Sequence, residues 1–589
     1  MKLRLKTIHW FLFILILAAI GTYFISQDIS QFFPLQRDLL IFRNITIRAY
    51  KSGQLKWKLT AKKIRIKGKE GEIYTIEGIE KGFLHRKEKP PFTFTAQTAE
   101  YNSQLDEVLI KQPITFRSAN GDFFEGREIY LFGKQKKVMI TAPVRAKFDG
   151  NYFQADRMMA QGEGLDFITL RDNVRTVIPD IEKSSSEKVK KEVEDLKDKK
   201  KYMKNFTIGA DVMTYNSVSR TLICAPKDVP PIYLPGQKPE KPEGFVDMNT
   251  ERFDMRARQL QVNFEVKSVH AHGDVWIRRK REKPDPQKSR LARAIGKKDA
   301  VFQTDEMIYM WKEGVINIPN KVSMRQEKID ATSGSAVINL RADNIKFVGG
   351  TTLHQKSGEW LIRDEVIEKD APKKNKEIAA AETTVRCDAV EVNLETEDIL
   401  AAGGVSVVQK ERKLNGESAS YDGAEKAWRI TGNPKAVEKE NILTAETFIY
   451  DERSNRFIAT GSARSEFLPD EDYKDDLDEY FSERDGEDEK REKFEKNKVA
   501  VEADELDYHQ KDEILIAAGS VVVRYRDIVF AAPQAVINYK EKTVKGDGGV
   551  RIEDKYAETD AEKFHANWET RDLSLEGGVR MNHRGRKKT

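Results

Sequence analysis

His270 and His272 are the first residues whose type and spacing could support chemistry, because residues two apart on a strand share one face. Two imidazoles at this spacing could begin a zinc site, but such a site needs a third protein ligand, and none is evident. Paired acids are plentiful, yet they occupy outward or turn positions, where a solvated charge is the ordinary role. We therefore predict no catalytic residue, no metal site and no cofactor.

The two cysteines, Cys224 and Cys387, lie far apart in the sequence and on predicted inward positions. This placement favours two buried, small apolar side chains over a disulfide or a reactive thiol. The chain also has no Gly-x-x-x-x-Gly-Lys-[Ser/Thr] phosphate loop, so any ATP must be hydrolysed by a partner. We expect that the protein is not an enzyme.

A repeat of about 29 residues decides the predicted architecture. A small residue is followed 16 positions later by a glycine, and uninterrupted repeats start 29 residues apart, at 387, 416, 445 and at 503, 532, 561. A chain of this kind is a stack of equivalent units, none of which can bury its apolar face alone. The pairs are Ala257/Gly273, Ser333/Gly349, Cys387/Gly403, Gly416/Gly432, Ala445/Gly461, Ala503/Gly519, Ala532/Gly548 and Ala561/Gly577.

Within a repeat, apolar residues stand 3, 5, 12, 14, 18 and 20 positions after the small residue. Spacing by two is typical of a strand with one apolar face. The alternation slips by one between the small residue and position 3, which predicts a bulge or corner. Polar residues between positions 5 and 12 predict a tight turn. Each of 14 repeats is expected to add one strand to each of two facing sheets.

Residues 8–25 are nearly all apolar and just long enough to span a membrane. Lys2, Arg4 and Lys6 precede them, so residues 1–7 are expected to be cytoplasmic and the rest exported. A cleaved signal peptide is the alternative, but residues 21–26 show no A-x-A site, which favours a retained anchor. The predicted membrane-spanning residues include Trp10, Phe11, Leu12, Ile14, Leu15, Leu17 and Ile20.

The chain has 589 residues, of which 33% are charged, and a net charge of +5. This near-neutral balance argues against a nucleic-acid partner, which would call for a strongly basic surface. Charged insertions at 181–205 and 466–498 and a basic tail at 584–589 are predicted to be solvated.

The exported, repetitive β-chain resembles the lipopolysaccharide-export bridge proteins in two parts. Residues 40–180 resemble the membrane-anchored LptC family through the stretch from Tyr50 to Ala61. Residues 206–465 and 499–583 resemble the soluble OstA/LptA-like repeats, as in Ala503-Asp504-Glu505-Leu506-Asp507-Tyr508 with Ala518-Gly519-Ser520-Val521. The chain departs from both families in its length and its charged insertions.

The resemblance implies an elongated, twisted β-jellyroll, a V-shaped stack of two sheets, in the periplasm and anchored to the inner membrane. It also implies an apolar groove that carries lipopolysaccharide. Partners implied are the β-domain of an inner-membrane ABC exporter at the N-terminal edge, near 45–66, and another bridge subunit or an outer-membrane β-domain at the C-terminal edge, near 561–583. The groove candidates are Leu260, Val262, Val275, Ile277, Met307, Tyr309, Ile316, Ile318, Phe347, Val390, Val392, Val405, Val407, Trp428, Ile430, Phe448, Tyr450, Leu506, Tyr508, Val521, Val523, Val550 and Ile552.

Two other interpretations stay open from the residues alone. A parallel β-helix also has coils of this length and would suit an adhesin or a polysaccharide-active protein. A sandwich filled by its own side chains would give the same alternation and would act as an envelope tether.

Overall fold

The computed structural model describes residues 40–51, 54–67, 72–86, 89–141, 143–162, 164–179, 205–226, 244–280, 299–327, 329–359, 376–377, 380–467, 498–525, 528–567, 570 and 572–583. The predicted anchor at 8–25 lies outside these residues, as do the basic tail and almost all of the two charged insertions. No helix within the described ranges is both long and apolar enough to cross a membrane.

The described chain is all-β, as the repeat predicts, and divides into two compact units. Unit 1 comprises residues 1–195 and 205–246, and unit 2 comprises 196–204 and 247–589. The division follows Val246, at the start of strand β14 (Val246–Asn249).

Unit 1 contains 13 strands in its described residues. They are β1 (Leu40–Lys51), β2 (Gln54–Lys67), β3 (Ile73–Arg86), β4 (Lys89–Asn102), β5 (Glu107–Ser118), β6 (Phe123–Phe132), β7 (Lys137–Ile140), β8 (Val144–Phe148), β9 (Asn151–Ala155), β10 (Arg157–Gln161), β11 (Phe167–Pro179), β12 (Asn205–Asn216) and β13 (Thr221–Ala225).

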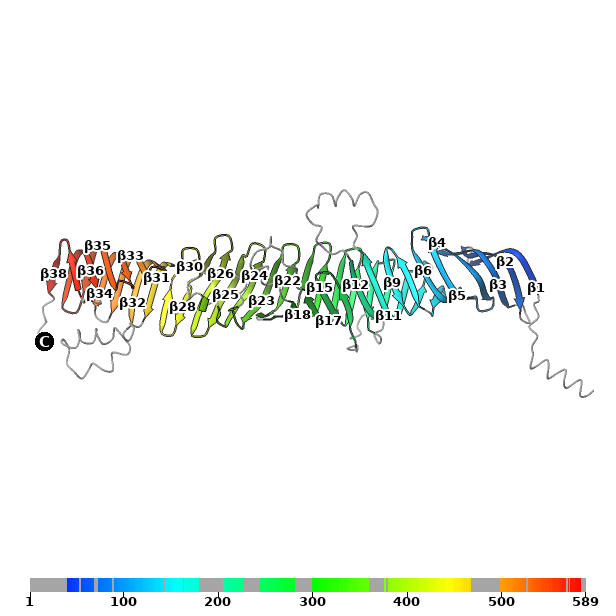
Figure 1. Cartoon of the computed structure of the whole chain (residues 1–589), viewed down its shortest axis with the longest axis horizontal. Helices are drawn as coiled ribbons and strands as arrows, with labels where there is room; N and C mark the ends of the chain where they lie inside the picture. Colours follow the sequence, from blue (N-terminus) through cyan, green and yellow to red (C-terminus); the bar gives the residue numbers. More distant parts are fainter. Residues whose placement is uncertain are drawn as a thin grey trace, which may run out of the picture. The chain divides into compact units, whose positions relative to one another are not determined.

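Unit 2 continues with strands of the same type (Figure 1). They are β15 (Phe253–Ala257), β16 (Gln259–Asn263), β17 (Ser268–Arg279), β18 (Ala300–Met310), β19 (Val315–Ile318), β20 (Val322–Gln326), β21 (Ile329–Ser333), β22 (Ser335–Asn339), β23 (Asn344–Gln355), β24 (Thr383–Asn393), β25 (Ile399–Gln409), β26 (Arg412–Asp422), β27 (Ala427–Thr431), β28 (Lys435–Glu438), β29 (Asn441–Thr444), β30 (Thr447–Asp451), β31 (Arg456–Phe467), β32 (Val499–His509), β33 (Ile514–Tyr525), β34 (Ile528–Asn538), β35 (Thr543–Glu553), β36 (Ala557–Asn567), β37 (Asp572–Glu576) and β38 (Arg580–His583).

Each long strand of unit 2 is bent at its middle, so that its two halves belong to two walls. The register of β24 against β25 shifts between Arg386 and Ala389, and the register of β32 against β33 shifts between Glu502 and Glu505. Where the bend is sharper, the halves form separate strands, as in β15 and β16, which both pair with β17. The slip in the sequence alternation therefore marks a corner, as predicted.

The glycine that follows each small residue by 16 positions forms this corner. All eight of these glycines have a left-handed backbone, and so does the residue after each of them, whatever its type. At Gly519 (φ 75°), a Cβ atom would lie 2.2 Å from a carboxylate oxygen of Asp504, the residue that follows the small Ala503. Glycine is thus required twice, for its backbone angle and for its lack of a side chain.

The turns that join the two strands of a repeat have their own signature, which the sequence reasoning missed. Asn393 Oδ1 accepts hydrogen bonds from the backbone N–H groups of Glu395 and Thr396. Asn339 and Asn538 make the same two bonds in their turns, at the same position of the repeat. An Asn or Asp six positions after the small residue therefore starts the turn through its side chain.

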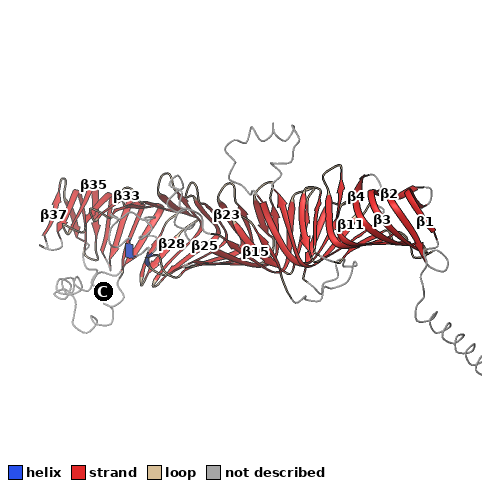
Figure 2. Ribbon diagram, turned by 45° about the vertical axis from the view of Figure 1, so that its right-hand side comes forward, coloured by secondary structure: helices blue, strands red, loops and turns tan. Residues whose placement is uncertain are grey.

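One detail of the expected architecture was wrong. Each uninterrupted repeat adds two bent strands, such as β32 and β33, rather than one strand to each of two sheets. The reason is that the bend lets a single strand cross both walls. The pairings between these strands are antiparallel, which rules out the parallel β-helix (Figure 2).

We predict that Gly519→Ala destabilises unit 2 by about 2–4 kcal/mol, because the new Cβ atom adds a clash to the strain of a left-handed alanine. Gly350→Ala is the matched control. Gly350 is also left-handed (φ 77°), but nothing lies within 4 Å of its would-be Cβ atom. Gly350→Ala should destabilise unit 2 by about 1 kcal/mol, from backbone strain alone. Urea-unfolding midpoints measure both, and equal midpoints for the two variants would contradict the steric role of the corner.

Candidate functional site

The two walls of unit 2 face one apolar interior. In β30–β34, Val501 comes from the half of its strand next to the links between repeats, and Leu506 from the half next to the hairpin turn. Both belong to one buried cluster with Phe448, Ala517 and Val521. Apolar side chains from both walls thus meet along the line of the bends, and this contact buries the apolar face that no repeat buries alone.

We name the two edges of the walls by their turns. The hairpin rim consists of the turns within repeats, such as 340–343, 394–398, 423–426 and 510–513. The link rim consists of the turns between repeats, such as 250–252, 410–411, 439–440 and 554–556.

The interior of β24–β36, which we call the open section, is buried at the bend and half-exposed above it. The groove candidates beside the bend are buried: Val390, Val405, Phe448, Leu506, Val521 and Val550. The candidates nearer the rims remain half-exposed although they belong to the same apolar face: Val392, Val407, Trp428, Ile430, Tyr450, Tyr508, Val523 and Ile552. This section therefore presents a row of apolar side chains that its own walls cover only in part.

Aromatic rings lie along the hairpin wall of the open section. Tyr421 packs on Trp428 at a centroid distance of 4.9 Å, and its hydroxyl bonds to Glu452 at 3.2 Å. Tyr508 packs edge-on against Tyr539 at 6.3 Å, and Tyr539 is 42% exposed at the rim. Such side chains suit a boundary between an apolar interior and water, because they are apolar in body and polar at the tip.

The outer face of the same strands carries paired charges. Glu391 lies between Val390 and Val392 in the sequence and binds Lys346 at 3.1 Å and Asn344 at 2.8 Å. Asp507, between Leu506 and Tyr508, pairs with Arg456 and His509. Around Val392 and Tyr508, the residues that alternate with the apolar ones are therefore charged and ion-paired.

The interior of β15–β22, which we call the closed section, is filled. Tyr309 occupies the same repeat position as Tyr508, yet it is 0% exposed. Its ring packs edge-on against Phe253 of the opposite wall at 5.2 Å, so the aromatic contact crosses the interior. The groove candidates of this section are all buried: Leu260, Val262, Val275, Ile277, Met307, Tyr309, Ile316 and Ile318. Phe347, in the next strand, is also buried.

Unit 1 is filled as well. Phe92, Phe116 and Phe124 stack in its interior at centroid distances of 4.5–4.9 Å. Arg86 pairs with Asp122 at 3.4 Å while both side chains are more than nine-tenths buried, and the guanidinium lies 4.0 Å over the Phe92 ring. Burial lowers the pKa of Arg86, and Asp122 opposes this effect.

In unit 1, polar contacts join turns from different repeats. Lys89 binds Asp166 at 3.2 Å and Ser217 at 2.6 Å, and the Tyr215 hydroxyl donates to Asp149. Burial, together with the hydrogen bond to the Asp149 carboxylate, raises the pKa of Tyr215. These contacts lie far apart in the sequence, so the repeat pattern could not reveal them.

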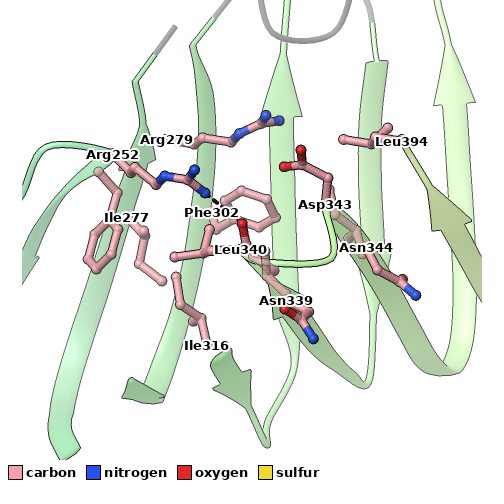
Figure 3. Close-up of a pocket in the computed structure, with 13 residues that line it drawn as sticks. Arg252, Ile277, Arg279, Phe302, Ile316, Asn339, Leu340, Asp343, Asn344 and Leu394 are labelled. Carbon is pink, nitrogen blue, oxygen red and sulfur yellow. Dashed lines mark hydrogen bonds between the residues drawn. The ribbon is translucent and has the colours of Figure 1, made fainter. Parts of the chain in front are cut away.

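A small pocket lies between the closed and open sections (Figure 3). It encloses about 30 Å³, enough for a water molecule but not for a lipid chain. Its floor is apolar, with Phe302 and Ile316, and Arg252, Arg279 and Asp343 lie at its mouth.

The residues with potential chemistry occupy ordinary structural positions. The rings of His270 and His272 lie 6.2 Å apart, and burial together with the neighbouring His272 lowers the pKa of His270. No group of three or more metal-ligating side chains occurs within the described residues. Cys224 and Cys387 are buried and free, as predicted.

Comparison with known proteins finds similar solved structures but no family. No family model matches the chain, and no curated protein matches it. Among solved structures, it is similar to LptH from Pseudomonas aeruginosa, described as the LptA-homologous periplasmic component of the lipopolysaccharide transport device. The identity is 11%, the TM-score is 0.17, and the match covers 29% of this chain and 93% of LptH.

Burial raises the pKa of both cysteine thiols. Few thiolates therefore form at pH 8, and a reagent cannot reach them in the folded chain. We predict that a disulfide-exchange reagent titrates no thiol in the native protein at pH 8 and two thiols in denaturing urea. Reaction of either thiol in the native protein as fast as in urea would contradict their burial.

Proposed function

We propose that this protein is a periplasmic bridge that carries lipopolysaccharide from an inner-membrane ABC exporter toward the outer membrane. The observation that supports this proposal most is the half-exposed apolar row of the open section, from Val392 to Ile552. Acyl chains placed there would leave water at a gain of about 0.8 kcal/mol per buried CH₂ group. The repeat makes successive positions similar in energy, which suits a lipid that slides.

The placement of polar groups fits an amphipathic cargo. The tails would lie between the walls at the bend, next to Leu506 and Val521, while the sugars project past the rims into water. The tyrosines of the hairpin wall would lie at the boundary between the two. The resemblance of β32–β33 to the OstA/LptA-like repeats supports the same lipid class.

The chain ends support partners that add strands. β1 pairs with β2 and exposes Leu40 and Phe42, and β38 pairs with β36 and exposes Met581. An exposed strand edge is a template for another strand. We propose that β1 pairs with the exporter's β-domain, and that the edge formed by β37 and β38 pairs with a further bridge subunit or an outer-membrane β-domain. Residues 8–25 would anchor the chain in the inner membrane, with the bulk in the periplasm.

A tether without lipid is the second candidate, because the closed section and unit 1 are filled by their own side chains. In that case the half-exposed row of the open section would carry nothing.

Photo-crosslinking in cells separates the two candidates. We predict that a photoreactive residue at Val392, Tyr508 or Val523 forms adducts with lipopolysaccharide while the ABC exporter is active. The matched control is Glu391, next to Val392 on the outer face, which should form none. Equal labelling of both faces, or none at either, would contradict the proposal and favour the tether.

A charge in the open section should block binding without unfolding the chain. We predict that Val523→Asp weakens lipopolysaccharide binding by the purified protein at least about tenfold, since a carboxylate would be desolvated by acyl chains. Val522→Asp, on the opposite face of the same strand, should bind as the unchanged protein does. Equal affinities of the two variants would show that the inner face is not the binding surface.

A further inference from the structure

The interior of unit 2 changes from closed to open within a few strands, although the repeat continues. Tyr309 and Tyr508 hold equivalent positions, and the first is buried against the opposite wall while the second is half-exposed. The change takes place at β23, where Ile345 is half-exposed while Phe347 is still buried. An acyl chain in the open section would therefore meet a wall of side chains at this point.

One polar contact crosses from rim to rim at this same place. Arg252, in the link-rim turn before β15, donates from Nη1 to the backbone carbonyl of Leu340, in the hairpin-rim turn after β22, at 2.6 Å. The two residues lie 88 positions apart in the sequence, so the contact joins two separate repeats. A hydrogen bond from a guanidinium is among the stronger single contacts in proteins.

Both ends of this contact are fixed by their own turns. The backbone carbonyl of Arg252 accepts a hydrogen bond from Lys280 N–H, and its N–H donates to Thr250 Oγ1. In the facing turn, Asn339 Oδ1 accepts from the N–H groups of Arg341 and Ala342. The contact thus links two turns that are each held by their own hydrogen bonds.

The pocket lies directly beneath this contact (Figure 3). Phe302 and Ile316 of the closed section line one side, and Ile345 and Leu394 line the side toward the open section. The mouth is polar and the floor apolar, which matches the two parts of an anionic amphiphile. The pocket is too small for an acyl chain, because its volume is about that of one water molecule.

We propose that the Arg252–Leu340 contact is a latch that separates the open section from the closed section, and that acyl chains enter the closed section only when it opens. The pocket is then the point where an acyl chain first parts the two walls. This inference rests on the proposed function and assigns a gate to the same apolar interior. The aromatic contact between Phe253 and Tyr309 lies behind the latch and must separate when a chain passes.

The test uses the purified full-length chain and palmitate with a photoreactive diazirine on its chain, followed by mass spectrometry of the labelled peptides. In the unchanged protein we expect label on residues 383–567 and none on 253–338. Arg252→Ala should raise labelling of 253–338 at least about tenfold, the shift expected from losing one charge-assisted hydrogen bond. Arg252→Lys keeps a cationic donor and should stay close to the unchanged protein.

Arg256→Ala is the matched control, because Arg256 lies on β15 and pairs with the exposed Asp247 at 2.7 Å on the outer surface. It should label as the unchanged protein does. Circular dichroism and urea-unfolding midpoints check the fold of each variant. If Arg252→Ala fails to fold, Arg252→Gln, which keeps most of the side-chain stem and loses the charge, takes its place.

The outcomes separate the latch from the proposed function. Label on 383–567 that does not extend to 253–338 in Arg252→Ala would overturn the latch and leave the proposed function standing. Equal label on both sections of the unchanged protein would also overturn it. No label on either section would overturn the proposed function, and the latch with it.

Discussion

Unit 2 depends on a backbone constraint, two successive left-handed residues at each of eight corners. At Gly461 and Ser462, as at the seven other corners, the strand turns so that its halves lie in two walls. A flat sheet with one apolar face would need a second sheet to cover it. Here the two halves of each bent strand lie in facing walls, and the apolar residues on both sides of the bend pack against each other. At six of the eight corners, all but those at Gly349 and Gly548, a Cβ atom at the first position would also lie within 3.0 Å of a side chain on the neighbouring strand.

The bend does not set the distance between the two walls at their rims. In the closed section and in unit 1, aromatic contacts such as Phe253–Tyr309 and Phe153–Tyr215 join opposite walls, at 5.2 Å and 6.0 Å. In the open section, Tyr421–Trp428 lies along a single wall at 4.9 Å, whereas Phe530–Phe564 still joins the two walls at 5.0 Å in its last strands. The cross-wall contacts therefore vary along the repeat.

The sequence predicted the all-β fold, the antiparallel hairpins and the corner, because each has a local cause. The slip in alternation and the glycine at position 16 locate the bend to the residue. The Asn or Asp at position 6, which starts the turns at Asn339, Asn393, Asp422, Asp451 and Asn538, was equally visible but was not recognised. The crossing of both walls by one strand was not recognised either. The alternation alone placed Tyr309 and Tyr508 in one class of groove candidates.

The different burial of Tyr309 and Tyr508 could not be predicted from the alternation, because it depends on long-range contacts. Arg252 and Leu340, or Lys89 and Ser217, come together from distant repeats and follow no period. Position 14 of the repeat gives no local signal either, because small and large residues occur there in both sections: Ala271 and Ile318 in the closed section, Ala401 and Ile430 in the open section.

The most direct test of the account is an experimentally determined structure of the full chain with lipopolysaccharide bound. The account predicts acyl-chain density between the walls of β24–β36, in contact with Val392, Tyr508 and Val523, and sugars beyond the rims. A lipid bound elsewhere on the chain, with these side chains packed against one another across the interior, would contradict it.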